Sequence, residues 1–116
     1  MPAVVLVVDD EPAIRDAIAL LLEDEGYRVL TARNGDEALG LLAAPPPTDV
    51  VVSDVMMPLV GGHALVRAMR ARGDATPVIL ISAAAPPLDG VPGVTHMRKP
   101  FDLDALLAAV ADALRG

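Results

Sequence analysis

Three runs of consecutive apolar, mostly β-branched residues constrain the fold of this chain more than any other feature. They are Val4–Val8, Val50–Val52 and Val78–Ile81. A strand with one face in water alternates apolar with polar residues, and these runs do not alternate. They therefore predict strands that are buried on both faces, as in a parallel sheet covered by helices on each side.

Helical patterns separate the apolar runs. Apolar residues recur at helical spacing in four segments, which we expect to be helices. They are a helix that begins at Pro12 and is stopped by Gly26, Gly35–Ala44, a helix after Gly61-Gly62, and Leu103–Leu114. The expected inner side of the last helix is formed by Leu103, Leu106, Leu107, Val110 and Leu114. Two shorter strands are expected at Arg28–Ala32 and Val94–Arg98. Alternating strands and helices predict an α/β fold, a doubly wound five-stranded parallel sheet.

Composition excludes several classes of function. The 116 residues fit one domain, residues 1–116. A formal charge of −7 and only 2% aromatic residues argue against nucleic-acid binding and base stacking. The absence of cysteine excludes disulfides and thiolate metal sites. No apolar run is long enough to cross a membrane and the N-terminus lacks a signal-peptide pattern, so we expect a soluble, cytoplasmic protein.

Polar residues follow the predicted strands at the point where each strand ends. Asp9 and Asp10 follow the first strand, Asp54 the third, Ser82 the fourth and Lys99 the fifth. In a doubly wound sheet, ligands bind beyond the carboxyl ends of the strands. We therefore expect these five side chains to meet at one edge of the sheet.

The chemistry of this group favours phosphoryl transfer. The adjacent carboxylates Asp9, Asp10 and Glu11 repel one another, and the N-terminus of the helix that follows would stabilise only one of them. Hard oxygen ligands in small number select Mg²⁺, or Mn²⁺ as the alternative. Asp54 stands alone at its strand end, as a nucleophile would. Lys99 could pair with Asp54 and then with a phosphoryl group.

Four motifs in this order resemble the receiver domain of bacterial two-component response regulators, over the whole length of the chain. They are "VVDDEP", "DVMMPLVGG" from Asp54, "ISA" from Ile81 and "KPF" from Lys99. The resemblance implies a flavodoxin-like strand order, 2-1-3-4-5.

The resemblance also implies roles for single residues. Asp54 would be the phosphorylation site, charged by a histidine kinase or a histidine phosphotransfer protein. Asp10 would bind Mg²⁺ directly, Asp9 mainly through bound water, and the backbone carbonyl of Met56 would be a further ligand. These metal and phosphoryl assignments are expectations carried over from the family.

Further implied roles concern the fourth and fifth strands. Ser82 resembles the family's switch hydroxyl, and the peptide bond between Lys99 and Pro100 is expected to be cis. His96 occupies the position of a switching aromatic ring, and it is equally consistent with a half-buried strand residue. His63, at the start of the third helix, is expected to be solvated.

The segment between the fourth and fifth strands departs from the family pattern. Only sixteen residues separate Ser82 from Lys99, and three prolines and two glycines lie among residues 83–93. These residues oppose a regular helix. We expect the family's fourth helix to be short or missing, and the protein to be a monomer.

The predicted function is a phosphorylation-operated switch that acts on a downstream protein target and is not a turnover enzyme. It would catalyse only its own phosphorylation and dephosphorylation. The chain is interpreted as a stand-alone receiver; it could also be cut from a larger regulator or hybrid kinase, or be a pseudo-receiver that only binds proteins. A magnesium-dependent phosphatase is disfavoured, because such enzymes carry a second Asp where this chain has Met56.

Overall fold

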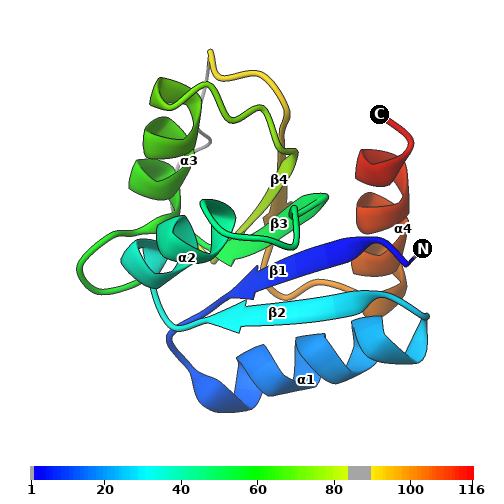
Figure 1. The fold of residues 1–116 in the computed structure, drawn as a ribbon. Coiled ribbons are helices and arrows are strands. Elements are labelled where there is room, and N and C mark those ends of the chain that lie inside the picture. The colour runs from blue at the N-terminus through cyan, green and yellow to red at the C-terminus, as the bar shows by residue number, and fades with distance from the viewer. Residues whose placement is uncertain (1, 84–89) are drawn as a thin grey trace.

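Five parallel strands form the centre of the molecule. The structure is a computed structural model that describes residues 2–83 and 90–116. The strands pair in the order β2-β1-β3-β4-β5, which confirms the expected topology (Figure 1). Their bounds are β1 Val4–Val8, β2 Arg28–Ala32, β3 Val50–Asp54, β4 Val78–Ser82 and β5 Val94–Arg98.

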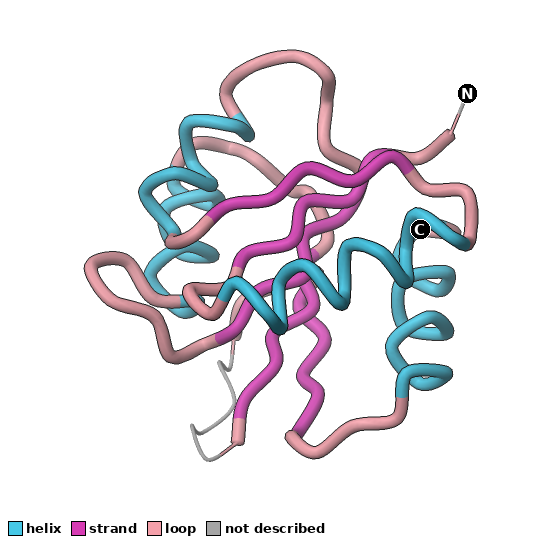
Figure 2. Tube along the Cα trace, turned by 90° about the horizontal axis from the view of Figure 1, so that it is seen from below, coloured by secondary structure: helices cyan, strands magenta, loops and turns pink. Residues whose placement is uncertain are grey.

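Helices cover both faces of the sheet, as the uninterrupted apolar runs predict. They are α1 (Pro12–Asp24), α2 (Gly35–Leu42), α3 (Gly62–Ala71) and α4 (Leu103–Leu114). In Figure 2 the strands run between helices that lie on either side. None of the helices in the described part of the chain is long and apolar enough to span a membrane.

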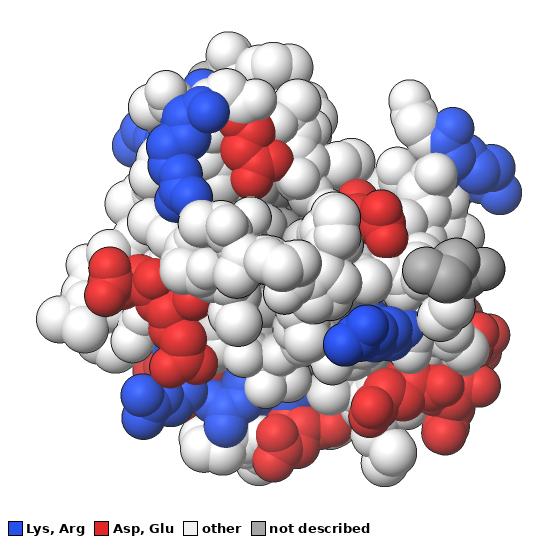
Figure 3. All heavy atoms as spheres, viewed as in Figure 1, with Lys and Arg blue, Asp and Glu red and all other residues white. Residues whose placement is uncertain are grey.

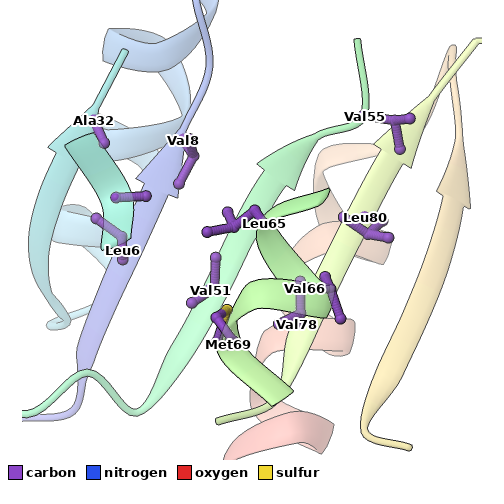
Figure 4. Packing of buried hydrophobic residues seen from close by; sticks show 11 residues of the cluster. Leu6, Val8, Ala32, Val51, Val55, Leu65, Val66, Met69, Val78 and Leu80 are labelled. Atoms are coloured by element: carbon purple, nitrogen blue, oxygen red, sulfur yellow. The ribbon is translucent and has the colours of Figure 1, made fainter. Parts of the chain in front are cut away.

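Each face of the sheet has its own apolar cluster. On one face Leu65, Val66 and Met69 of α3 lie over the strand residues Val51, Val78 and Leu80 (Figure 4). On the other face α1 and α4 pack on the sheet through Ile18, Leu22, Leu106 and Val110. Every residue of β1, β3 and β4 is buried, so the sheet is held by apolar burial from both sides.

Local capping fixes where several helices begin. Pro12 is the first residue of α1, where its missing N–H leaves no hydrogen bond unmade. The side chain of Asn34 accepts a hydrogen bond from the amide of Glu37 at the start of α2, and Asp102 accepts one from Asp104 at the start of α4. These caps place the turns that follow β2 and β5 at the carboxyl edge of the sheet.

Two expectations about the helices are wrong. Helix α2 ends at Leu42, two residues earlier than expected. Leu103 is 54% exposed and does not lie on the inner side of α4. Leu103 is the first residue of the helix, and Phe101 in the preceding turn packs against the apolar cluster in its place.

The segment between β4 and β5 is described only in part. Ala83 and residues 90–93 form bends and turns, and no helix lies between β4 and β5 among the described residues. The expectation of a short or missing fourth helix also concerns residues 84–89, which lie outside the described residues.

Candidate functional site

Three carboxylates meet at the carboxyl edge of the sheet, where the strand ends predict them. Asp9, Asp10 and Asp54 each offer an oxygen atom within 4.8 Å of the others. The strand register explains the meeting, because Val8 of β1 lies beside Ser53 of β3 and the next residues are Asp9 and Asp54. Asp9 and Asp54 are 3% and 8% exposed, whereas Asp10 is exposed to solvent.

Lys99 supplies a positive charge to this group. Its Nζ lies 3.4 Å from Oδ2 of Asp54, as the sequence predicts. The amide of Lys99 donates a hydrogen bond of 2.9 Å to the carbonyl of Ser82, which ties the end of β5 to the end of β4. The peptide bond from Lys99 to Pro100 is cis, which confirms that expectation.

The electrostatics of the site favour a bound cation. Burial raises the pKa of the Asp9 carboxyl above its ordinary value, and the charges of Asp54 and Asp10 raise it further. The backbone amide of Glu11, which donates to Oδ1 of Asp9 at 2.9 Å, and the charge of Lys99 oppose that shift. One ammonium therefore offsets only part of the repulsion among three carboxylates, and a divalent cation would offset the rest.

The donor set fits Mg²⁺ or Mn²⁺. Carboxylate oxygens in small number at a partly open site leave room for water and for a phosphate oxygen. Met56 lies two residues beyond Asp54, and its amide makes a long contact of 3.4 Å with Oδ1 of Asp54. Its side chain is 70% exposed. A soft thioether is a poor ligand for a hard cation, so the Met56 side chain is not counted among the metal ligands. The expected ligand role of its carbonyl stays a prediction.

Ser82 and His96, the two predicted switch residues, differ in burial. Ser82 ends β4 beside the carboxylates and is 9% exposed, in a position suited to the expected switch hydroxyl. His96 is exposed on β5, three residues before Lys99. The half-buried alternative for His96 is therefore wrong, and its switching role stays a prediction.

His63 is less solvated than expected. Its side chain is partly buried, and its Nε2 atom is buried with no hydrogen-bond partner in the described part of the chain. Desolvation lowers the pKa of His63, and the charges of Arg67 and His96 lower it further. The expectation missed this environment because it depends on how α3 lies against the sheet.

Close backbone packing beside Asp54 depends on Gly62, whose role the sequence did not reveal. A Cβ atom at Gly62 would lie 2.7 Å from the carbonyl oxygen of Asp54 and 2.9 Å from Cα of Val55. The amide of Gly62 donates to the carbonyl of Val55 at 2.9 Å. The Gly61-Gly62 pair was the available signal, interpreted only as the lead into a helix.

Comparison with known proteins gives one consistent family. The family model of the response regulator receiver domain matches residues 5–111. Response regulator MprA of Mycolicibacterium vanbaalenii is 39% identical over 120 residues, which cover 99% of this chain and 52% of that protein. A probable transcriptional regulatory protein of Picosynechococcus is 40% identical over 122 residues, 96% of this chain and 49% of that protein. The chain thus spans about half the length of these curated relatives.

Solved structures show the same fold. Chemotaxis protein CheY4 of Vibrio cholerae matches with a TM-score of 0.88 at 33% identity, covering 98% of this chain and 100% of that one. The receiver domain of the hybrid histidine kinase CckA matches with a TM-score of 0.82 at 36% identity, covering 97% and 99%. With the carboxylates and Lys99 placed as described, the chain belongs to the response regulator receiver domain family of two-component signalling.

Proposed function

We propose that this chain is a switch operated by phosphorylation of Asp54. The observation that carries the proposal is the 3.4 Å contact between Lys99 and Asp54 inside a group of three carboxylates. The phosphoryl donor is a phosphohistidine of a histidine kinase or a histidine phosphotransfer protein. A carboxylate oxygen of Asp54 forms the new O–P bond while the N–P bond breaks, and the imidazole leaves with the electron pair of that bond.

Mg²⁺ completes this site in the proposal. Asp10 would bind the ion directly, Asp9 would act mainly through bound water, and Asp54 and the Met56 carbonyl would supply the remaining protein oxygens. The ion would neutralise charge on the phosphoryl oxygens, which carboxylates alone would repel. The raised pKa of Asp9 supports this assignment, because the buried carboxylate lacks a full complement of positive charge.

Lys99 and Ser82 respond to the transferred group. Lys99 holds Asp54 before transfer and binds a phosphoryl oxygen afterwards, since its Nζ already lies beside the reacting carboxylate. Ser82, at the neighbouring strand end, donates its hydroxyl to the phosphoryl group. Hydrolysis of the acyl phosphate by water returns the switch to its first state, so the only substrate is the protein itself.

We also propose how the switch acts in the cell. Residues 1–116 act as one receiver domain and as a monomer in the cytoplasm, and pass the signal to a downstream protein. The chain covers all of the CheY4 chain and about half of MprA, so a free receiver and the receiver of a longer regulator both fit. A pseudo-receiver is disfavoured by the intact acidic group and its lysine.

Labelling with acetyl phosphate tests the proposal. The parent protein with Mg²⁺ should gain the mass of one phosphoryl group, measured by intact-protein mass spectrometry. Asp54→Asn should gain none, and the exposed Asp36→Asn should label like the parent. A chelator should stop labelling. Label retained in Asp54→Asn would overturn the assignment, and a parent that never labels, from small donors or from kinases, would favour the pseudo-receiver.

A further inference from the structure

Positive charge is concentrated in one part of this acidic chain. Residues 55–101 hold five of the nine Lys and Arg residues and both histidines, but only two of the sixteen acidic residues, Asp74 and Asp89. In Figure 3 most of the acidic side chains lie in the lower half of the face shown, together with some basic ones, and basic side chains lie over α3 at the upper left beside an acidic group. The chain therefore carries a locally basic region within a net acidic surface.

One flank of α3 carries two of these Arg residues together with His63. The buried residues of α3 are Gly62, Leu65, Val66 and Met69. His63, Arg67 and Arg70 follow one another at intervals of four and three residues, so they share a single stripe beside that buried side. No acidic residue lies between Asp54 and Asp74, so the stripe contains no negative charge.

This stripe faces the strand β5. The guanidinium group of Arg70 donates to the carbonyl of Pro92 at 3.0 and 3.1 Å, just before β5 begins. The same group donates to the carbonyls of Asp74 and Thr76 at 2.8 and 3.0 Å. Arg70 therefore joins the end of α3 to the start of β5. Its guanidinium group is already hydrogen-bonded to these backbone carbonyls.

The side of β5 that faces α3 is also basic. Val94 packs against the apolar cluster that contains Leu80 and the α3 residues. Leu80 lies directly beside His96 in the parallel ladder, and alternate residues of a strand share a face. His96 and Arg98 therefore lie on the side of the sheet that α3 covers, and both are exposed.

Two of these cations have no counter-ion. Arg67 and Arg98 are exposed, and neither side chain makes a hydrogen bond or an ion pair within residues 2–83 and 90–116. Most of the other Lys and Arg side chains form an ion pair with a carboxylate or a hydrogen bond with a backbone carbonyl. Within the described residues Asp74 borders this surface next to Arg70, and the unpaired positive charges of Arg67 and Arg98 attract an anionic partner.

We propose that the α3–β5 face, defined as His63, Arg67, Arg70, His96 and Arg98, binds an acidic segment of a partner protein. At one end of this face lies a hollow of about 400 Å³. Its lining is mainly apolar or glycine (Gly73, Ala75, Gly90, Val91 and Pro92), with Arg70 and Asp74 as its charged residues. An apolar side chain at one end of the acidic segment fits this hollow. The surface lies outside the carboxylate site, and the proposal does not depend on phosphorylation of Asp54.

A protein segment fits this face better than a nucleic acid. Recognition of single strands uses exposed aromatic rings, and the two aromatic residues, Tyr27 and Phe101, pack against the apolar cluster on the opposite face of the sheet. A long polyanion would also meet the net charge of −7. A short acidic segment contacts only the locally positive surface and is repelled less by the rest of the chain.

Peptide titration followed by NMR amide shifts tests the proposal. The probe is a glutamate-rich peptide that ends in a leucine, and the comparison probes are a lysine-rich peptide with the same leucine and oligo-dT. We expect shifts at α3 and β5 with the acidic peptide only. Arg67→Glu/Arg98→Glu should weaken binding about tenfold, since two exposed ion pairs with the peptide are lost and the reversed charges repel it.

The control variant Arg28→Glu/Arg115→Glu changes the net charge by the same amount at exposed sites elsewhere. It should bind within about threefold of the parent, and Asp54→Asn should bind like the parent. Equal weakening by both double variants would overturn the proposal, as would shifts confined to other elements. Tighter binding of oligo-dT at the same residues, or a concentration-dependent dimer that Arg67→Glu/Arg98→Glu abolishes, would assign the face to a different occupant and also overturn it.

Discussion

Asp9 is the residue at which fold stability and function conflict. Its carboxylate is 3% exposed and lies beside Asp10 and Asp54, with Lys99 as the nearby cation. A buried anion among anions destabilises the fold, and the raised pKa of Asp9 expresses that cost. Such a cost is typical of sites that are built to receive an ion.

Replacement of Asp9 by Asn should stabilise the metal-free protein. The pKa of Asp9 is higher in the folded state than in the unfolded state. The protonated side chain therefore stabilises the fold fully below the pKa of the unfolded state, and this stabilisation is lost as pH rises through the pKa of the folded state. At pH 7 the ionised carboxylate is therefore unfavourable. We expect Asp9→Asn to raise the free energy of unfolding by about 1 kcal/mol in urea melts with a chelator.

Asp10→Asn is the matched control for Asp9→Asn. Asp10 is exposed, so the change should affect the free energy of unfolding less than Asp9→Asn does. It should nevertheless weaken Mg²⁺ binding more, because a direct ligand contributes more than one that acts through water. Metal-free stability that falls in Asp9→Asn, or equal Mg²⁺ affinities in both variants, would contradict this account.

His63 should make stability depend on pH near neutrality. Its pKa is lowered in the folded state by desolvation and by the charges of Arg67 and His96. The unfolded state then binds more protons in the window below the ordinary histidine pKa, so stability falls as pH falls from about 7.5 to about 5.5. Gln cannot ionise, so His63→Gln should show a smaller fall between these two pH values in urea melts. An unchanged fall would refute the role of His63.

At the scale of elements, the junction of β3 and α3 determines the position of Asp54. The strand ends at Asp54, and α3 begins at Gly62, whose backbone lies against the backbone of Asp54 and Val55. Gly35 makes a similar approach to Val60 in the connecting loop, to which its amide donates at 3.0 Å. Two glycines thus let α2 and α3 approach the loop that follows Asp54.

Gly62→Ala should separate α3 from β3 and disturb Asp54. The added Cβ would lie 2.7 and 2.9 Å from backbone atoms, which cannot rotate away. Overpacking of this kind costs about 1–3 kcal/mol. Gly40→Ala is the control, because nothing lies within 4 Å of the added Cβ and a helix interior gains about 1 kcal/mol from the change. We expect thermal melts to move in opposite directions and labelling to fall only in Gly62→Ala.

The strands were predictable because their signal is local. An apolar run buried on both faces and ended by a polar residue is visible without any knowledge of neighbours, and β4 and β5 lie where the pattern predicts them. The same signal located Asp9, Asp54 and Lys99, since strand ends converge in a parallel sheet.

The errors concern distances between elements. Helical spacing places Leu103 on the apolar side of α4. Spacing alone does not reveal that Leu103, the first residue of the helix, is exposed and that Phe101 packs against the apolar cluster instead. The burial of His63 and the need for Gly62 both depend on how closely α3 approaches the sheet. A single sequence does not contain that distance.

At the scale of the whole molecule, the site joins three strands that are far apart in sequence. Asp9 and Asp10 follow β1, Asp54 ends β3, and Lys99 follows β5. A cation bound there would feel the charges of groups from Asp9 to Lys99, and its site would exist only when the sheet is assembled. Binding to the folded state alone stabilises it by about 1.4 kcal/mol when free ion is tenfold above the dissociation constant.

Lys99 and Mg²⁺ should therefore compete in stabilising the fold. Lys99→Ala removes a positive charge 3.4 Å from Asp54, so the metal-free protein should be less stable and Mg²⁺ should bind several-fold more tightly. Thermal unfolding across a Mg²⁺ titration measures both effects, with Arg33→Ala as the control because its ion pair with Glu37 lies outside the site. The variant should still label poorly with acetyl phosphate, since the phosphoryl oxygens lose their cation. Weaker Mg²⁺ binding in Lys99→Ala than in the parent would show that Lys99 orders the carboxylates instead of competing for them.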